Sequence, residues 1–406
     1  MRAQRDTAHR GAGREPHALQ SPRPRSGLSG RRPPELLDDT MPQLRALFLS
    51  KFSELNAACR YRMAQYFPLL RSAGIECDLE PLLPDEYIHR IYGSGSRKTT
   101  LTRLSPLVAR SLLRRWRRVR SASMYDVVYL QYEALPYVPF WLESSLFRSG
   151  AGVVVDFDDA VNLTYEDHPN PVLRRLLGSK IQRVTRASRQ VTVANRHMAE
   201  WAGRFNPRVT ILPNSVDLER YPLDGGNLRR AESGVPLIGW IGTPVTAQYL
   251  QLVAEPLRRL RSRFDFRLRV IGAPDFRMDG VDVEAVPWSE ATEVALLQEC
   301  DIGVMPLSDD SWSRGKSALK LIQYMSAGIA AVASPVGANV DVLRDGRNGF
   351  LAATEDEWVD RLSLLLEDGE LRRRLAESGR RTVEESFSLQ RNAQRLERVL
   401  RAAGTP

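Results

Sequence analysis

Short apolar runs alternate with segments of helical periodicity along nearly the whole chain, beginning just after Met41. This alternation is typical of parallel sheets covered by helices, because a parallel connection has to cross the face of the sheet. It stops once, at residues 213–236, where prolines and glycines accumulate as in an interdomain linker, and then starts again. The sequence therefore predicts an α/β fold of two Rossmann-like, doubly wound domains, with ligands in the interdomain cleft at the carboxyl ends of the strands.

The apolar runs predict the individual strands. In the first half these are Leu44–Leu49, Glu76–Leu82, Val127–Leu130, Val153–Phe157, Gln190–Val193 and Val209–Leu212. In the second half they are Leu237–Trp240, Arg267–Ile271, Val281–Val286, Ile302–Pro306 and Ala330–Ala333. Helices are predicted at Ala57–Ala73, Pro106–Val119, Pro171–Ala187, Arg196–Ala202, Thr246–Phe264, Glu290–Glu299 and Ser317–Ser326, and the chain from Glu355 to Ala402 is predicted to be helical.

Four segments follow from this division of the 406 residues. Residues 1–40 hold 8 Arg, 5 acidic residues and 5 Pro without apolar periodicity, so we expect a disordered tail or a mis-assigned start. Residues 41–215 are expected to form the first domain and 216–384 the second. Residues 385–406 are expected to form a C-terminal helix that is a candidate for packing back on the first domain.

The formal charge of +9 is concentrated rather than spread. Residues 97–120 hold nine Lys and Arg and no acid, and a helical wheel places Leu112 and Trp116 opposite Arg110, Arg114 and Arg117. Such a helix is either a solvated face or a contact for an anionic membrane. Nucleic-acid binding is not expected, because no recognition motif or aromatic interleaving accompanies the charge.

Cysteine and histidine usage adds two expectations. The three cysteines, Cys59, Cys77 and Cys300, are odd in number and lack metal spacing, which favours a reducing compartment. The five histidines form no cluster, and no run approaches the roughly 18 apolar residues that span a bilayer. We therefore expect a cytoplasmic protein, soluble or peripheral at the inner membrane face, without a metal site.

The segment Lys316-Ser-Ala-Leu-Lys320-Leu-Ile-Gln323 follows a predicted strand and opens a predicted helix. Free N–H groups and the positive end of the helix dipole make such a position suitable for an anion, and Lys320 adds a mobile charge suited to phosphate. Gln323 lies on the same face, where it could bond a ribose hydroxyl. The alternative is that Lys316 and Lys320 form only a solvated helix face. After Gly328 a strand leads to a second loop, Ser334-Pro-Val-Gly337.

In the first half, Val153-Val-Val-Asp156-Phe-Asp158-Asp159 runs a buried strand into three carboxylates. Clustered acids at the carboxyl edge of a sheet raise one another's pKa and can bind a hydroxyl or a cation. Asp158 and Asp159 are candidates for holding a hydroxyl, or they only cap the following turn.

Taken in order, these motifs resemble glycosyltransferase family 4 (glycosyl transferases group 1), retaining enzymes of the GT-B fold. Besides the Lys320 helix, the resemblance rests on three segments: Ile211-Leu-Pro-Asn-Ser-Val-Asp217, Gly239-Trp-Ile-Gly242 and Asp345-Gly-Arg-Asn-Gly-Phe350. It covers essentially residues 41–402. The sequence departs from the family at its two glutamates, where Gly315 and Gln323 stand, and at its Arg and Lys pair, replaced by Thr243-Pro-Val-Thr246. An Asp-X-Asp metal motif of the GT-A fold at Asp156 and Asp158 is discounted, because that fold would not explain the motifs of the second half.

The resemblance implies an enzyme that moves a hexose from a nucleotide-sugar donor to a saccharide, lipid-linked or polysaccharide acceptor, with retention and without a metal cofactor. The residues expected to bind the donor are Gly242, Trp288, Lys316, Lys320, Gln323, Ser334 and Gly337. Those on the acceptor side are Arg60, Asp158 and Asp159, with Asp158 and Lys320 as the catalytic candidates. Trp288 contacts the base or packs in the core, and Arg60 meets a phosphate or flanks a helix. The alternative functions are a nucleotide-sugar epimerase on the same fold and a glycosyltransferase-like protein that only binds.

Overall fold

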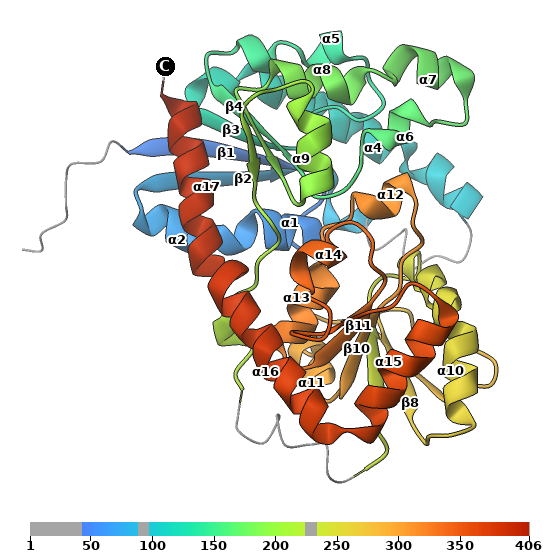
Figure 1. The fold of residues 1–406 in the computed structure, drawn as a ribbon. Helices are drawn as coiled ribbons and strands as arrows, with labels where there is room; N and C mark the ends of the chain where they lie inside the picture. The colour runs from blue at the N-terminus through green and yellow to red at the C-terminus, as the bar shows by residue number, and fades with distance from the viewer. Residues whose placement is uncertain (1–42, 88–96, 224–233, 406) are drawn as a thin grey trace, which may run out of the picture. The chain divides into compact units, whose positions relative to one another are not determined.

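The computed structural model of this chain describes residues 43–87, 97–223 and 234–405, with the side chains of 97–105 left aside. Two parallel six-stranded sheets, each flanked by helices, make up the described part of the chain (Figure 1). The predicted tail at 1–40 lies outside the described residues. The α/β architecture predicted from the alternating pattern is confirmed.

The first sheet has the strand order β2-β1-β3-β4-β5-β6. Its strands are β1 (Leu44–Ser50), β2 (Ile75–Pro81), β3 (Val127–Gln131), β4 (Gly152–Phe157), β5 (Gln190–Val193) and β6 (Val209–Ile211). Every pair in it is parallel, and β1 aligns Ala46 with Cys77 of β2 and with Val127 of β3. β3 and β4 are buried along their whole length, as expected for strands covered on both faces.

The second sheet has the order β12-β11-β10-β7-β8-β9 and is also parallel throughout. Its strands are β7 (Leu237–Ile241), β8 (Arg267–Ile271), β9 (Val283–Val286), β10 (Ile302–Met305), β11 (Ala330–Ala333) and β12 (Phe350–Leu351). All the predicted strands are present within a few residues of their expected ends. The sequence missed β12, because two residues are too few to produce a periodic signal.

The helices of the first half differ from the predictions where proline or glycine intervenes. The predicted helix Ala57–Ala73 is broken into α1 (Ala57–Arg62), a 3₁₀ turn at Ala64–Tyr66 and α2 (Phe67–Ser72), with Pro68 in the first turn of α2. The predicted Pro171–Ala187 helix is interrupted at Gly178 and Ser179 into α7 (Pro171–Leu177) and α8 (Lys180–Ala187). The remaining helices are α4 (Arg97–Arg120), α5 (Phe140–Glu143), α6 (Leu163–Glu166) and α9 (Arg196–Gly203).

In the second half the helices surround the second sheet. The predicted Thr246–Phe264 helix starts as a 3₁₀ segment, Thr246–Val253, and continues as α10 (Ala254–Arg261). The others are α11 (Glu293–Gln298), α12 (Ser311–Arg314), α13 (Leu319–Ser326), α14 (Asn339–Val342), α15 (Glu355–Glu367), α16 (Gly369–Ser386) and α17 (Leu389–Gly404). The sequence did not predict the four-residue helices α12 and α14, which are too short to carry a period.

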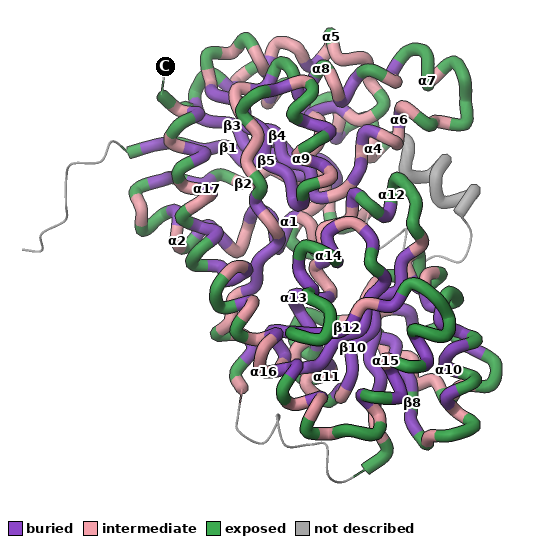
Figure 2. Tube along the Cα trace, viewed as in Figure 1, coloured by how far each residue is buried: buried purple, intermediate pink, exposed green. Residues whose placement is uncertain are grey.

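The last helix, α17, leaves the second domain and lies along the first sheet (Figure 1). Its apolar face, which includes Leu396 and Leu400, is buried with Phe48 and Tyr129 in one core. The chain passes between the domains near Val216 and again near Ser388, and these two segments pair with each other, since Val216 donates to the Phe387 carbonyl at 3.1 Å. The central strands of both sheets are buried, and exposed residues gather on the helices and loops (Figure 2).

Two topological switch points follow from the strand orders. In the second sheet the chain winds outward in opposite directions from the neighbours β7 and β10, and in the first sheet from β1 and β3. The loops at the carboxyl ends of such neighbours diverge and leave a crevice, which is where ligands bind in open α/β sheets.

Candidate functional site

A small cavity lies at the switch point of the second sheet, at the carboxyl ends of β7 and β10. Its lining comprises Trp240, Thr246, Tyr249, Met305, Pro306, Leu307, Lys316 and Lys320. The two lysines are the only charged residues in that lining, so the crevice that the topology creates is cationic. It is suited to an anionic ligand.

Both lysines are set by the turn that leads into α13. Ala318, the N-cap of that helix, has φ 54°, a left-handed conformation unusual for a residue with a Cβ. Lys320 is therefore the second residue of α13, among the first-turn N–H groups that have no partner within the helix. The Lys320 ammonium lies 5.3 Å from the Trp240 ring centroid, and the Lys316 ammonium lies 5.6 Å from that of Tyr249.

Burial and charge act together on Lys320. Desolvation, followed by repulsion from Lys316, lowers the pKa of Lys320 to about 8, and attraction to Asp159 opposes the shift. The Lys320 ammonium therefore loses its proton at a lower pH than an ordinary lysine does. A bound phosphate would supply the missing counter-charge and restore the charged form.

The acidic loop after β4 faces these lysines from the first domain. Desolvation raises the pKa of Asp159, and its attraction to Lys316 and Lys320 limits the shift. Desolvation and the neighbouring Asp159 charge raise the pKa of Asp158, which is buried. The structure thus brings together four of the predicted site residues, Asp158, Asp159, Lys316 and Lys320.

Asp156, the third carboxylate of the segment, has a different environment. It is fully buried and forms a two-pronged ion pair with Arg62, whose Nε donates to Asp156 Oδ2 at 2.9 Å and whose second nitrogen donates to Oδ1. Thr192 also donates to Asp156 Oδ1, at 2.7 Å. Asp156 therefore serves the interior of the first domain. Within the described residues, no three His, Cys, Asp or Glu side chains are placed to hold a metal ion.

Tyr132, which the sequence reasoning did not select, holds Asp158. It follows β3, has φ 63°, and donates its hydroxyl to Asp158 Oδ1. At the end of the neighbouring β1, half-buried Lys51 has its pKa lowered by desolvation, and its backbone N–H donates to Gln131 at 2.9 Å. These residues stand at the switch point of the first sheet. Knowing that β1 and β3 are neighbours would have pointed to these residues, but strand order depends on the tertiary structure and is not visible in the sequence.

The Arg314–Lys316 turn is fixed by residues of the first domain. Asn195, the N-cap of α9, donates its amide to the carbonyls of Gly315 and Lys316, each at 2.9 Å. Asn214 donates to the Ser317 hydroxyl at 2.7 Å. A Cβ on Gly315 would lie 2.7 Å from the Ala160 backbone nitrogen. Glycine at this departure from the family pattern is thus required by the approach of the acidic loop.

Three other residues predicted to bind the donor, Gly337, Ser334 and Gly242, make packing contacts or hydrogen bonds within the protein. Gly337 has φ 55°, and a Cβ there would lie 2.5 Å from the Arg314 carbonyl oxygen, so its loop packs on the same turn. Ser334 is buried, and its hydroxyl accepts the Leu307 N–H at 2.9 Å, which ties together the loops after β10 and β11. A Cβ on Gly242 would lie 2.5 Å from the Trp240 ring, at the edge of the cavity.

Gln323 is not directed at the cavity through its amide nitrogen. That nitrogen donates to Glu293 Oε1 at 3.0 Å and to the Tyr61 hydroxyl at 3.2 Å. The buried Glu293 carboxylate also accepts from Tyr61 at 2.7 Å and from the Trp288 ring nitrogen at 2.6 Å. The contact with ribose that the sequence suggested would require this network to open, because the amide donor is already engaged.

Arg60 and Trp288 meet each other. The Arg60 guanidinium lies 4.8 Å from the Trp288 ring centroid, and its NH1 donates to the Glu54 carbonyl at 2.9 Å. Trp288 is half-buried against the core of the second domain. Of the alternatives for Trp288, the structure displays the packing contact, with Arg60 stacked on the ring. Neither residue borders the lysine cavity.

On the basic helix α4, the predicted outward arginines Arg110, Arg114 and Arg117 are exposed, and further arginines form internal contacts. Arg114 donates to the Pro81 carbonyl at 2.8 Å, and buried Arg115 donates to the Ser50 carbonyl at 2.8 Å. Arg118 forms an ion pair with Glu80 at 2.9 Å. Arg114 and Arg115 thus satisfy carbonyls at the carboxyl ends of β2 and β1. Three of the nine basic residues of 97–120 are engaged in these contacts, while Arg110 and Arg117 stay exposed.

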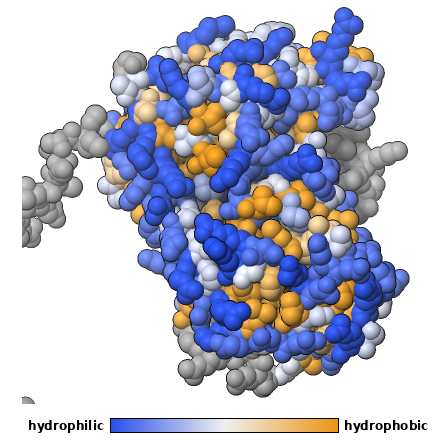
Figure 3. Space-filling model, in the orientation of Figure 1, coloured by the Kyte–Doolittle hydropathy of each residue, from blue (hydrophilic) through white to orange (hydrophobic). Residues whose placement is uncertain are grey.

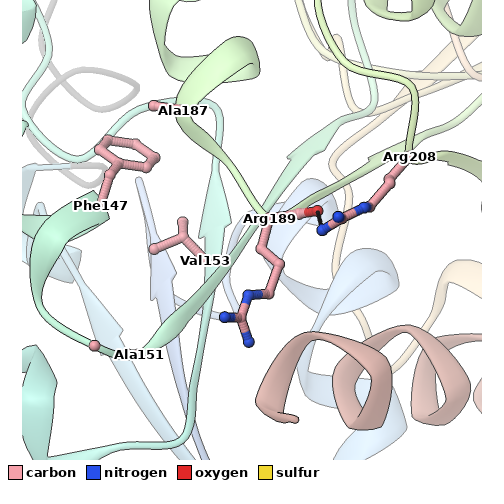
Figure 4. Close-up of a pocket in the computed structure, with 7 residues that line it drawn as sticks. Phe147, Ala151, Val153, Ala187, Arg189 and Arg208 are labelled. Atoms are coloured by element: carbon pink, nitrogen blue, oxygen red, sulfur yellow. Dashed lines mark hydrogen bonds between the residues drawn. The ribbon is translucent and has the colours of Figure 1, made fainter. Parts of the chain in front are cut away.

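A second cavity, of about 260 Å³, lies away from the lysines at the start of β4 (Figure 4). Its residues come from the amino-terminal edge of the first sheet, and Arg208 donates to the Arg189 carbonyl there at 3.5 Å. The Arg189 side chain donates to the Ala403 carbonyl at 2.8 Å and so holds the end of α17. The residues of this cavity attach the end of α17 to the first sheet. The smaller cavity at the switch point, with its two lysines, is the better candidate for binding a ligand.

Comparison with known proteins covers the segment that forms the lysine cavity. Residues 235–368, which contain the lysine cavity, match the family model described as glycosyl transferases group 1. A stretch of 89 residues is 32% identical to spore coat protein SA of Bacillus subtilis (strain 168). That alignment spans 21% of this chain and only 24% of the relative's length.

Solved structures resemble the chain over most of its length. Sucrose-phosphate synthase from Thermosynechococcus elongatus has a TM-score of 0.62 at 11% identity, over 88% of this chain and 98% of that one. Anabaena HepE, solved in complex with UDP and glucose, has a TM-score of 0.61 at 16% identity, over 88% of this chain and 99% of that one. Residues 235–368 are thus similar to glycosyl transferases group 1, and the chain has the two-domain α/β fold of GT-B glycosyltransferases.

Proposed function

We propose that this chain is a glycosyltransferase that moves a hexose from a nucleotide-sugar donor to a saccharide, lipid-linked or polysaccharide acceptor. The observation that carries the proposal is the pairing of Lys316 and Lys320, at the switch point of the second sheet, with Asp158 and Asp159 from the first domain. One side of this arrangement suits a diphosphate and the other suits a hydroxyl. The family match of residues 235–368 supports the same reading.

The donor would lie with its diphosphate over the start of α13. Lys316 and Lys320 would stabilise the negative charge that develops on the leaving nucleotide, the electrostatic contribution that usually dominates such catalysis. The loops of Gly242 and of Ser334 to Gly337 would border the donor by their backbones. Anabaena HepE, whose structures contain UDP and UDP-glucose, makes a uridine nucleotide the first donor to test.

The acceptor hydroxyl would meet Asp158, which Tyr132 orients. We further propose retention of configuration, as the family 4 resemblance implies: the acceptor approaches the face from which the nucleotide leaves, and the departing phosphate oxygen takes its proton. In this scheme Asp158 orients the acceptor. No step requires a metal ion supplied by the protein.

The proposed alternatives differ in what they need. An epimerase on this fold depends on acid and base side chains, including a histidine, at the sugar, and no histidine lines the lysine cavity. A protein that only binds would keep the two lysines and release no nucleotide. In the described part of the chain, no helix has the length and apolar character to cross a membrane, so we place the enzyme in the cytoplasm, free or peripheral at the membrane.

The decisive experiment incubates the protein with a panel of labelled nucleotide sugars and measures nucleotide release, with and without a membrane extract as acceptor source. Transfer of label to the extract supports a transferase, while interconversion of the free nucleotide sugar would indicate an epimerase. Donor binding without either would leave a binding protein. In Lys320→Met, which keeps the aliphatic stem, turnover should fall by roughly 10²–10³-fold. Wild-type turnover in that variant would overturn the phosphate assignment.

A further inference from the structure

Four large apolar side chains stand exposed on the loops that follow β3 and β4. They are Tyr137 at 56%, Trp141 at 67%, Val172 at 61% and Leu176 at 64% of their full accessible surface. We call these four residues, with Arg174 and Arg175, the α5–α7 surface. Exposed apolar residues that gather in one place mark a contact surface more often than scattered ones do.

Ring contacts and helix geometry connect the members of this surface. The Tyr137 ring lies 5.5 Å from Tyr165 of α6 and 6.4 Å from His168, just before α7. Trp141 follows four residues later as the second residue of α5, and α5 contacts α8, the helix that follows α7. Val172 and Leu176 are one helical turn apart on α7 and so share a face. At α7, in the upper right of Figure 3, orange and dark blue side chains lie next to each other.

The charge around the apolar residues has one sign. From His168 to Arg189 the chain holds six Lys and Arg and no acid. Arg174 and Arg175 are exposed, and no ion pair of the described residues involves either of them. Uncompensated arginines beside apolar side chains suit an anionic lipid surface, where apolar groups enter the interface and each cation near it contributes roughly 1 kcal/mol.

We propose that the α5–α7 surface docks on an anionic bilayer. The same loops carry Tyr132 and Asp158, at the ends of β3 and β4. Resting on the proposed function, docking would therefore bring the acceptor side of the site to the membrane and select a lipid-linked acceptor. The short α7 helix inserts Val172 and Leu176, Trp141 lies at the headgroup level, and the arginines bind the phosphates.

The test is flotation of the full chain with vesicles of phosphatidylcholine alone or mixed with phosphatidylglycerol. Wild type should float with the anionic vesicles, and raising the salt to 0.5 M should weaken that binding about tenfold or more. The triple variant W141S/V172S/L176S and the double variant R174Q/R175Q should each reduce the bound fraction at least about fivefold. Met124→Ser, at 63% exposure before β3 and thus at the opposite edge of the sheet, is the matched control and should bind like wild type.

Three results would overturn the proposal: wild type that does not float, a triple variant that floats like wild type, or loss of binding only in R110Q/R117Q, which would place the contact on α4. Sedimentation of wild type and triple variant tests the other occupant, a second copy of the chain. A dimer lost in the triple variant would also count against the membrane. Nucleotide release without membranes should be the same in both proteins, so a failure of docking is separable from a failure of the proposed transferase.

Discussion

At the scale of single residues, the surroundings of Lys320 change its pKa and therefore predict how ligand binding depends on pH. It is desolvated beside Lys316, and its pKa is lowered to about 8. A group with a lowered pKa loses its charge as the pH rises through that value, so the affinity of the site for an anion should fall there.

We predict that the affinity for UDP, measured by calorimetry, falls by about tenfold between pH 7.5 and 9.5 as Lys320 deprotonates. Lys320→Met should bind more weakly at pH 7.5 and lose this slope. The phosphates of UDP are already largely ionised at pH 7.5, and the uracil N3–H titrates equally for both proteins, so the difference in slope between wild type and Lys320→Met reports Lys320. A Lys320→Met variant that retains the slope would assign the titration to another group.

The ion pair of Arg62 and Asp156 belongs to the same scale but serves stability. Both side chains are completely buried, and Arg62 is held by Asp156 and by the Leu212 carbonyl. Removing one partner of a buried pair leaves the other charge without compensation.

Arg62→Ala should therefore lower the free energy of unfolding by about 3–5 kcal/mol in urea titrations at pH 7. The control is Arg45→Ala, whose partner Glu76 lies 3.3 Å away with both side chains about half exposed. That change should cost at most about 1 kcal/mol. Equal effects in the two variants would contradict the structural role of the Arg62–Asp156 pair.

At the scale of elements, the start of α9 is coupled to the turn before α13. Asn195 accepts the Met198 N–H at 2.8 Å as an N-cap, and its amide donates to the Gly315 and Lys316 carbonyls. The two polar atoms of the Asn195 side chain therefore have different roles. The oxygen caps α9, and the nitrogen holds the backbone of the turn that carries Lys316.

Asn195→Asp separates these roles, because the carboxylate still caps α9 and cannot donate. We expect stability within about 1 kcal/mol of wild type and turnover reduced by roughly 10-fold or more. Asn170→Asp is the matched control, since Asn170 caps α7 in the same way, and its side chain accepts the Val172 and Leu173 N–H groups of its own helix at 2.9 and 3.4 Å. A loss of turnover in both variants would show that the effect is not specific to the turn.

Elements were predictable where the pattern was long and local. The strands of both sheets follow from apolar runs, while the breaks in the helices at Met63 and Gly178 and the two-residue β12 did not appear in the pattern. The α13 helix was predicted at Ser317 and begins at Leu319, because Ala318 takes a left-handed conformation that only the surrounding packing enforces. Lys320 consequently lies closer to the helix start than the sequence implied.

On the scale of the whole molecule, the C-terminal helix α17 completes the hydrophobic core of the first domain, so the stability of that domain depends on it. Leu396 and Leu400 are fully buried against residues of β1 and β3. A Cβ on Gly152 at the start of β4 would lie 1.9 Å from the Ala403 carbonyl oxygen, so the helix end approaches the sheet without a gap.

Leu396→Ala should reduce the free energy of unfolding by about 2–5 kcal/mol, because it opens a cavity between α17 and the first sheet. Leu364→Ala on α15, where the side chain is 42% exposed, should cost less than about 1 kcal/mol. Chemical denaturation followed by circular dichroism measures both. A small effect at Leu396 would mean that α17 is dispensable for the first domain.

The sequence by itself determined the two α/β domains, the strands within them and the residue types of the site, because apolar periodicity and short motifs are local properties. It also selected Asp158, Asp159, Lys316 and Lys320, which follow strands or open a helix. Only the tertiary structure decided that these four meet, that the Gln323 amide is engaged by Glu293, that Arg114 and Arg115 bond carbonyls, and that Tyr132 and Asn195 hold the site. Each of these depends on strand order and on contacts between residues far apart in the chain, which no local pattern encodes.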